Sequence, residues 1–317
     1  MTDYLITNDP FDLGGTLDTT AGKFDPDFAD HSIRLRDDVL HGVKLPETDS
    51  IWISFDVWFP SGGFGEDGYH WTVYSQDNVA ILFFDMLNDS ITFSSVTGSA
   101  REELAISIPR EQVARIDLHI ETNLDANPNN HKETLYVNGS ITAQSQQNGG
   151  GGGAPARFNF GGSDFLLPDE YWVSNVRITD ENPVGTKFKV LGPTGAGNYS
   201  DFVGGHVELG DFLATTVVYA EANGDRVSAT LTPGSQPPGT LTKTMVSSTS
   251  RSTGPGADPS QIGVFVRIGT VDYDGALVQP GASIVPIVEE YTVNPNTGLP
   301  WEWSDFTGLE IGLRAVT

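Results

Sequence analysis

Apolar and polar residues alternate with a period of two through most of the chain, and this pattern predicts β-strands. In the clearest segment, residues 51–59, five apolar residues alternate with Trp, Ser, Asp and Trp. Because successive side chains of a strand point to opposite faces, one face of this strand is wholly apolar. The tryptophans indicate that the other face is partly covered too. Similar strands are predicted in the first half at 33–35, 69–74, 79–84, 90–96, 116–121 and 134–137.

The second half repeats this alternation with different residues. Strands are predicted there at 212–220, 227–231, 262–268, 283–288, 289–293 and 309–315. A helix-like window at 100–114 is split by Pro109, so at most a short turn of helix is expected at 110–113. Five consecutive glycines at 149–153 predict an exposed loop. The predicted fold class is all-β.

The stretch 171–202 predicts a boundary between two β-domains. It starts as an apolar strand, passes through the polar residues Asp180 to Pro183 and ends in a Pro/Gly turn cluster that excludes helix. A chain of 317 residues is long enough for two domains with separate cores. We therefore predict one domain over residues 1–180 and a second over residues 185–317, each a β-sandwich.

Charge excludes some partners. The chain has 17 Lys and Arg against 42 Asp and Glu, a net charge of −25. This excess repels phosphate backbones and anionic lipid surfaces, so no nucleic-acid or membrane partner is predicted. The sequence contains no cysteine, which excludes disulfides and thiolate metal sites. No apolar run is long enough to span a bilayer, and we expect no secretory signal at residues 1–10.

Asp117, His119 and Glu121 share one face of a predicted strand, which is where a glycosidase of sandwich fold would place its carboxylates. Glycoside hydrolysis needs two carboxylates separated by roughly 5–5.5 Å or about 6.5–9.5 Å. Asp117 and Glu121 lie four strand steps apart, about 13 Å at ~3.3 Å per residue. Because this separation fits neither mechanism, we interpret the face as a solvated sheet surface, and no catalytic residue is predicted.

A calcium ion is the one cofactor that the sequence leaves open. Asn123, Asp125, Asn127 and Asn129 offer oxygen atoms at alternate positions, and residues 24–30 give a similar hint. The loop lacks the Gly and Glu of an EF-hand, since Pro128 and Thr134 occupy those positions. Asx-rich loops also arise because Asn and Asp side chains bind their own backbone in turns. Metal ligands are therefore unassigned, and no other cofactor is predicted.

Tyr69 and Trp71 are candidate glycan-binding residues, since an aromatic ring can stack on the C–H face of a sugar. The alternative is that both belong to the apolar face of one strand and pack in the core. Trp301 and Trp303 share a strand face in the same way, and they are expected to pack beneath the terminal strand. The six histidines are scattered, without metal-ligand spacing.

The first half resembles a laminin-G/concanavalin-like jelly roll. The resemblance covers about half of the chain and rests on four segments, namely the strands 51–59 and 116–121, the Leu135-Tyr-Val-Asn-Gly139 hairpin and the closing Tyr171-Trp-Val-Ser-Asn-Val-Arg-Ile178. Asn-Gly suits the two left-handed positions of a type I′ turn. The resemblance implies a jelly-roll sandwich over residues 1–180.

The second half carries Gly185 with Leu191-Gly-Pro-Thr-Gly-Ala-Gly-Asn198, then Asn294-Pro-Asn-Thr-Gly298 with Trp301 and Trp303, then a strand near the C-terminus. In these motifs it resembles a domain of structural proteins from tailed bacteriophages. Phe202 stands where that domain usually has Trp. The resemblance implies a virion component on a tail, baseplate or head fibre.

Together these resemblances predict a virion structural protein that mediates assembly and contacts a host-surface polysaccharide, without being an enzyme. Its partners are then other virion proteins and further copies of itself, with a trimer as the expected oligomer. The alternative is a polysaccharide-degrading tail enzyme with a lectin-like domain. A secreted bacterial lectin is a third interpretation, which the absence of an export signal disfavours.

Overall fold

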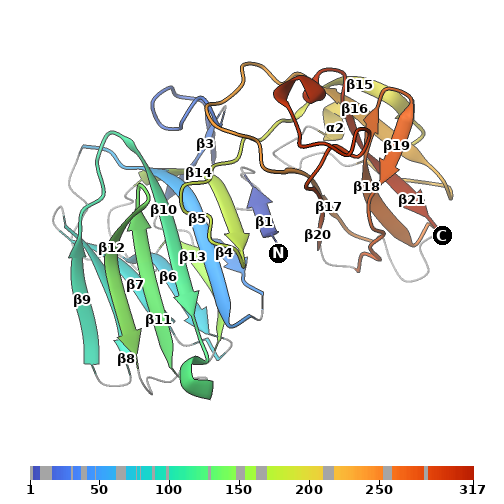
Figure 1. The fold of residues 1–317 in the computed structure, drawn as a ribbon. Helices are drawn as coiled ribbons and strands as arrows, with labels where there is room; N and C mark the ends of the chain where they lie inside the picture. Colours follow the sequence, from blue (N-terminus) through green and yellow to red (C-terminus); the bar gives the residue numbers. More distant parts are fainter. Residues whose placement is uncertain are drawn as a thin grey trace. The chain divides into compact units, whose positions relative to one another are not determined.

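The structure, a computed structural model, divides into two compact units, Met1–Val190 and Leu191–Thr317 (Figure 1). It describes residues 3–7, 16–29, 31–36, 41–46, 48–61, 69–75, 77–78, 80–87, 90–97, 100–127, 130–147, 154–161, 170–209, 218–252, 259–281 and 285–317. The predicted boundary at residues 180–185 separates two domains that fold independently. Compactness alone does not test independent folding, so this boundary stays a prediction.

Unit 1 contains two antiparallel sheets. The larger sheet runs in the order β12 (Ser140–Gln147), β11 (His131–Val137), β10 (Val113–Glu121), β5 (Ser50–Trp58), β14 (Glu170–Thr179), β3 (Ser32–Arg36) and β2 (Thr16–Asp18), with β1 (Asp3–Thr7) also paired to β14. The smaller sheet runs β4 (His41–Lys44), β13 (Pro155–Phe160), β6 (Tyr69–Ser75), β7 (Ala80–Leu87), β8 (Ser90–Thr97) and β9 (Ala100–Ile106). Neighbouring strands far apart in sequence, such as β5 and β14, close the jelly-roll topology.

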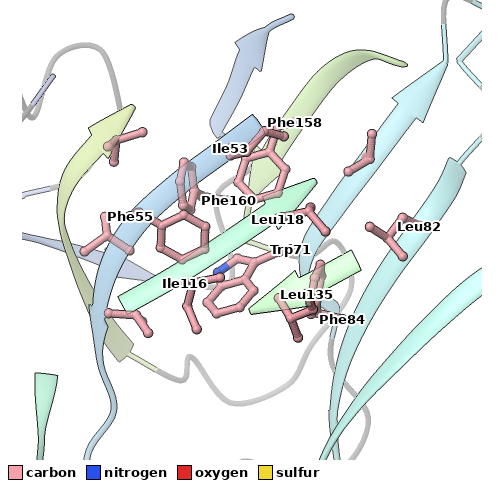
Figure 2. Close-up of a cluster of buried hydrophobic side chains, with 14 of the residues drawn as sticks. Ile53, Phe55, Trp71, Leu82, Phe84, Ile116, Leu118, Leu135, Phe158 and Phe160 are labelled. Atoms are coloured by element: carbon pink, nitrogen blue, oxygen red, sulfur yellow. The ribbon is translucent and has the colours of Figure 1, made fainter. Parts of the chain in front are cut away.

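The core of unit 1 lies between these sheets and is rich in aromatic rings (Figure 2). Trp71 of β6 packs edge-on against Phe55 of β5 at 4.8 Å and against Phe84 of β7 at 5.1 Å. Phe158 and Phe160 of β13 pack T-shaped on each other at 4.8 Å. Such edge-to-face pairs stabilise a core beyond their buried area. The predicted all-β class with an N-terminal jelly-roll sandwich is confirmed.

Unit 2 is a smaller β-structure with its own core. A five-stranded antiparallel sheet runs β15 (Pro193–Ser200), β16 (Arg226–Leu231), β21 (Glu310–Val316), β18 (Gln261–Ile268) and β19 (Val271–Asp274), and a second sheet pairs β17 (Thr244–Ser250) with β20 (Val285–Tyr291). Residues from both sheets meet in one apolar cluster, including Val246, Val264 and Ile287. None of the short helices in the described ranges has the length and hydropathy to cross a membrane.

The prediction of a short turn of helix at residues 110–113 is wrong. Residues 100–106 form β9, and β10 begins at Val113. Glu111 adopts the left-handed φ of 55°, and its N–H donates to the carbonyl of Phe59 at 2.8 Å, which ends any helical path. The predicted glycine loop at 149–153 and most of the predicted strand at 212–220 lie outside the described residues.

Candidate functional site

The eight-stranded sheet has an inner face in the core and an outer face that points away from the other sheet. Alternation along β5 sends four residues outward, namely Trp52, Ser54, Asp56 and Trp58. The register of β10 sets Asp117 opposite Ser54 and His119 opposite Trp52. The outer face therefore carries acids, a histidine and two tryptophans along two central strands.

A buried ionic cluster occupies the middle of this outer face. Arg115 donates from Nε to Asp117 Oδ1 at 3.2 Å and from Nη1 to Asp56 Oδ1 at 3.4 Å. Its Nη1 also donates to the carbonyl of Asn175 at 3.1 Å, and the Asn175 amide donates to Asp56 Oδ2 at 2.8 Å. Asp117 has an exposed fraction of 0%. The interpretation of this face as solvated is therefore wrong at its centre.

The turn at residues 183–186 explains this burial. Thr186 donates its N–H to the carbonyl of Pro183 at 2.8 Å and accepts from Arg177 Nη1 of β14 at 3.5 Å. At the far side, Val184 Cγ1 would lie 3.9 Å from a Cβ built on Gly139, in the β11–β12 hairpin. Since β5 and β10 lie between β14 and that hairpin, the turn crosses the outer face above the ionic cluster.

One end of the outer face stays partly open and is lined by aromatic rings. The ring of His119 stacks on the indole of Trp52, with centroids 4.0 Å and planes 6° apart. Tyr136 of β11 lies beside the same indole, 5.6 Å away between centroids, and is half-buried. His119 Nε2 and the hydroxyl of Ser50 share a hydrogen bond of 2.9 Å. We call Trp52, His119 and Tyr136 the aromatic end.

Charged groups border the aromatic end. Glu121 lies 3.8 Å from His119 Nδ1 and 3.3 Å from Lys132 Nζ, and both of its partners are half-buried. Burial lowers the pKa of His119 below its ordinary value of 6.5, with Glu121 opposing and Lys132 adding to the shift. The imidazole is therefore neutral at pH 7 and can both donate and accept a hydrogen bond.

The opposite end of the outer face is closed by a lysine. Lys23 Nζ lies 3.5 Å from the ring centroid of Trp172 and 5.5 Å from that of Trp58. Asp18 accepts from Trp172 Nε1 at 2.6 Å and from Lys23 at 3.1 Å. Burial alone would raise the pKa of Asp18, but hydrogen bonds from Thr20, Lys23 and Trp172 hold it well below the ordinary 3.8. These rings are thus engaged within the protein.

The prediction that Trp71 binds a glycan is wrong. Its side chain has an exposed fraction of 0% and is enclosed by core aromatic rings, so no sugar can stack on it (Figure 2). The competing interpretation, core packing, holds for Trp71 and for Val73. The side chain of Tyr69 lies outside the described part of the chain, and the backbone of Tyr69 pairs with that of Asp85.

The candidate calcium loops form turns. Asn123 and Asp125 adopt left-handed φ values of 57° and 55° around a single 3-10 turn, Leu124–Ala126, and Asn129 lies outside the described residues. In the other loop, the Asp25 carboxylate pairs with Lys187 at 2.6 Å and accepts the N–H of Asp27 at 3.1 Å. Within the described ranges, no group of three or more His, Asp or Glu side chains is placed to hold a metal ion.

The charged face of unit 2 is a balanced ion-pair network. Arg267 donates to Asp272 at 2.6 Å, and Arg226 binds both oxygens of Asp274 at 2.8 and 3.0 Å. The hydroxyl of Tyr199 donates to Asp272 at 2.6 Å, which raises the pKa of Tyr199. Arg226 and Arg267 each have a carboxylate partner, so neither of them offers an unpaired charge to a ligand.

The tryptophans of the second-half motif pack in the core as predicted, but the predicted shared strand face is wrong, because Trp301 lies outside the strands and Trp303 begins the 3-10 helix Trp303–Phe306. Trp301 is buried, donates from Nε1 to the carbonyl of Tyr291 at 2.9 Å and stacks on Phe306. Trp303 packs against the same core from its edge. Asn294 closes the preceding turn by accepting the N–H of Gly298 at 2.8 Å.

Comparison with known proteins places only the fold. No protein-family model and no curated protein matches the sequence. Among solved structures, the chain is similar to the cellulose-induced protein Cip1, with a TM-score of 0.41 and 11% identity over 53% of this chain and 85% of that one. It is also similar to an alginate lyase from Chlorella virus, with a TM-score of 0.39 and 10% identity over 56% of this chain and 92% of that one. A β-1,4-glucuronan lyase from Trichoderma reesei is similar too, with a TM-score of 0.39 and 10% identity over 56% of this chain and 90% of that one.

The comparison corrects one prediction. Two of these three structures are polysaccharide lyases with a sandwich of the same kind. The prediction that the protein is not an enzyme is therefore not kept, since the solved structures similar to this chain include an alginate lyase and a glucuronan lyase. At identities of 10–11% the likeness describes the fold and not the activity.

Proposed function

We propose that unit 1 binds carbohydrate on the outer face of its eight-stranded sheet, at the aromatic end. The observation that carries the proposal is the pair of partly exposed rings, His119 and Tyr136, packed on the buried indole of Trp52 and flanked by a carboxylate and an ammonium group. Sugar sites combine an apolar surface with a few polar groups that fix orientation. Tyr136 supplies the apolar surface, and Glu121 with neutral His119 supplies the polar groups.

The charges at this site favour a neutral glycan. The nearby cation, Lys132, is already paired with Glu121 at 3.3 Å. The net charge of −25 also repels an anionic polymer at a distance. A carboxylate such as Glu121 accepts hydrogen bonds from two hydroxyl groups, which suits the vicinal hydroxyls of an uncharged hexose.

We also propose that the protein is a virion component of a tailed bacteriophage that uses unit 1 for host-surface attachment and assembles as a trimer. The support is the sequence resemblance of residues 185–317, including the turn at 294–298 that docks Trp301 into the core of unit 2. Mass spectrometry of purified virions tests this proposal. Detection of the chain at a fixed copy number, divisible by three, supports it, and absence from virions refutes it.

A glycan array tests the carbohydrate proposal. The wild-type chain should bind neutral glycans, and Tyr136→Ala and His119→Ala should each weaken that binding at least tenfold. Tyr219→Ala is the matched control, because Tyr219 is an exposed tyrosine of unit 2. Equal binding by all four proteins would refute the site. The same glycans are then followed by chromatography, so that cleavage is detected if it occurs.

A further inference from the structure

The ionic cluster on the outer face contains buried polar atoms without hydrogen-bond partners. They are Ser54 Oγ, Ser174 Oγ, Asp117 Oδ2 and Arg115 Nη2. Ser54 stands opposite Asp117 in the β5–β10 register, and Ser174 stands opposite Asp56 in the β5–β14 register. Both serine side chains are fully buried. A buried polar group normally finds a partner, so these four atoms mark a place where one is missing.

The charges of the cluster are also unequal. Asp56 and Asp117 bring two carboxylates, and the one guanidinium that contacts both belongs to Arg115. Hydroxyl groups are suitable partners for the remaining acceptors, because they donate hydrogen bonds without adding charge. An anionic group would instead meet a site that is already acidic.

The cluster lies between aromatic residues of one strand. Trp52 and Trp58 point to the same face of β5 with Ser54 and Asp56 between them. Six strand steps separate the two tryptophans, which is about 20 Å at ~3.3 Å per residue. A strip of that length exceeds one sugar ring and suits an oligosaccharide.

The turn that covers the strip is held by the buried Pro183 and by several polar contacts around it. Its side-chain contacts include Arg177 with Thr186 at 3.5 Å and the partly exposed ion pair of Lys187 with Asp25 at 2.6 Å. Gly185 has a left-handed φ of 78°, a conformation that glycine adopts readily. The exposed ion pair contributes little to stability, so the main cost of lifting the turn is the exposure of Pro183.

We propose that the strip from Trp52 to Trp58 is a latent extension of the glycan site for a neutral oligosaccharide, and that the turn at 183–186 over its middle and Lys23 at its Trp58 end cover it until such a chain displaces them. This inference rests on the proposed function of the aromatic end. Short sugars would use the aromatic end alone, whereas longer chains would also satisfy the four unpaired atoms.

A disulfide lock tests the inference. The protein has no cysteine, so Gly139→Cys with Val184→Cys introduces a single thiol pair at the point where the turn meets the β11–β12 hairpin. Gly139 has a left-handed φ of 79°, which strains a cysteine there, so circular dichroism first checks that the reduced variant is folded. Mass spectrometry verifies the bond. Calorimetry then measures binding of cellohexaose, maltohexaose and mannohexaose, and of the three corresponding disaccharides, to the oxidised and reduced forms.

The reduced protein should bind one of the hexasaccharides at least tenfold more tightly than the oxidised protein, with equal disaccharide binding. Asp25→Asn, which frees Lys187, should strengthen hexasaccharide binding a few-fold, whereas Asp27→Asn should not. These substitutions keep the test decisive if the lock fails to close. Equal hexasaccharide binding by locked and released forms refutes the covered strip alone. Absence of binding by every form refutes the strip and the glycan site together.

Discussion

The imidazole of His119 lies flat against the indole of Trp52 across strands β10 and β5, with ring planes 6° apart. The stack is anchored at its edge, where His119 Nε2 and the Ser50 hydroxyl are 2.9 Å apart. A positive charge on the imidazole would have to form in this half-buried setting, so burial opposes protonation of His119.

Acidification should therefore destabilise the protein through His119. Its pKa is lowered by burial, so below about pH 6.5 the unfolded chain binds a proton that the folded chain resists. The stability contribution of the neutral ring is complete above pH 6.5 and is lost as the pH falls toward the folded pKa. Urea unfolding from pH 7.5 to 5 should show a steeper loss for wild type than for His119→Gln. Identical slopes would contradict this assignment.

Removal of the guanidinium from the ionic cluster should be costly. Arg115→Met leaves Asp56 and Asp117 buried without their shared cation, so the free energy of unfolding should fall by about 3–5 kcal/mol. The triple variant with Asp56→Asn and Asp117→Asn should recover much of this loss. Chemical denaturation of the three proteins measures the effect. If the Arg115→Met protein were as stable as wild type, the ionic cluster would be solvated.

Trp71 should behave as a core residue and not as a ligand contact. Trp71→Ala should lower the free energy of unfolding by about 3–5 kcal/mol, because it leaves a cavity among Phe55, Phe84 and Tyr171. Ile141→Ala, at a side chain 62% exposed in the same unit, should change it by no more than about 0.5 kcal/mol. Thermal and urea unfolding measure the free energy of unfolding of the Trp71→Ala and Ile141→Ala proteins and show whether the two losses differ.

Gly312 should tolerate no side chain. A Cβ there would lie 2.3 Å from the carbonyl oxygen of Val227 and 2.5 Å from the ring of Phe265. Gly312→Ala should destabilise unit 2 by about 1–3 kcal/mol, whereas Gly281→Ala, with open space around it, should be neutral. Calorimetry should show the unit 2 transition moving alone if the units unfold independently. A joint shift of the whole unfolding curve would refute the predicted pair of domains.

Much of the fold could be predicted from period-two alternation, because each sheet buries one face. The strand at 51–59 and the strand at 116–121 appear as β5 and β10 with the expected inner faces. The window at 100–114 misled because its composition suits a helix, while pairing with β8 decides for a strand. Propensity yields to such long-range contacts.

The site could be predicted only in part. Alternation places Trp52 on the second face of its strand, but alternation alone does not locate the segment that covers this face. Asp117 is buried because the turn at 183–186, more than sixty residues later in the chain, crosses it. Tyr136 was missed, although its place in the hairpin that ends in Asn138-Gly139 sets it two residues from the turn and opposite Asp117.

The most direct test of the account is the position of a bound neutral glycan, mapped by chemical-shift changes in the isotope-labelled protein. The account predicts the largest changes at His119, Glu121, Lys132 and Tyr136, with small changes in unit 2. Changes concentrated on strands β6 to β9, or on unit 2, would contradict it.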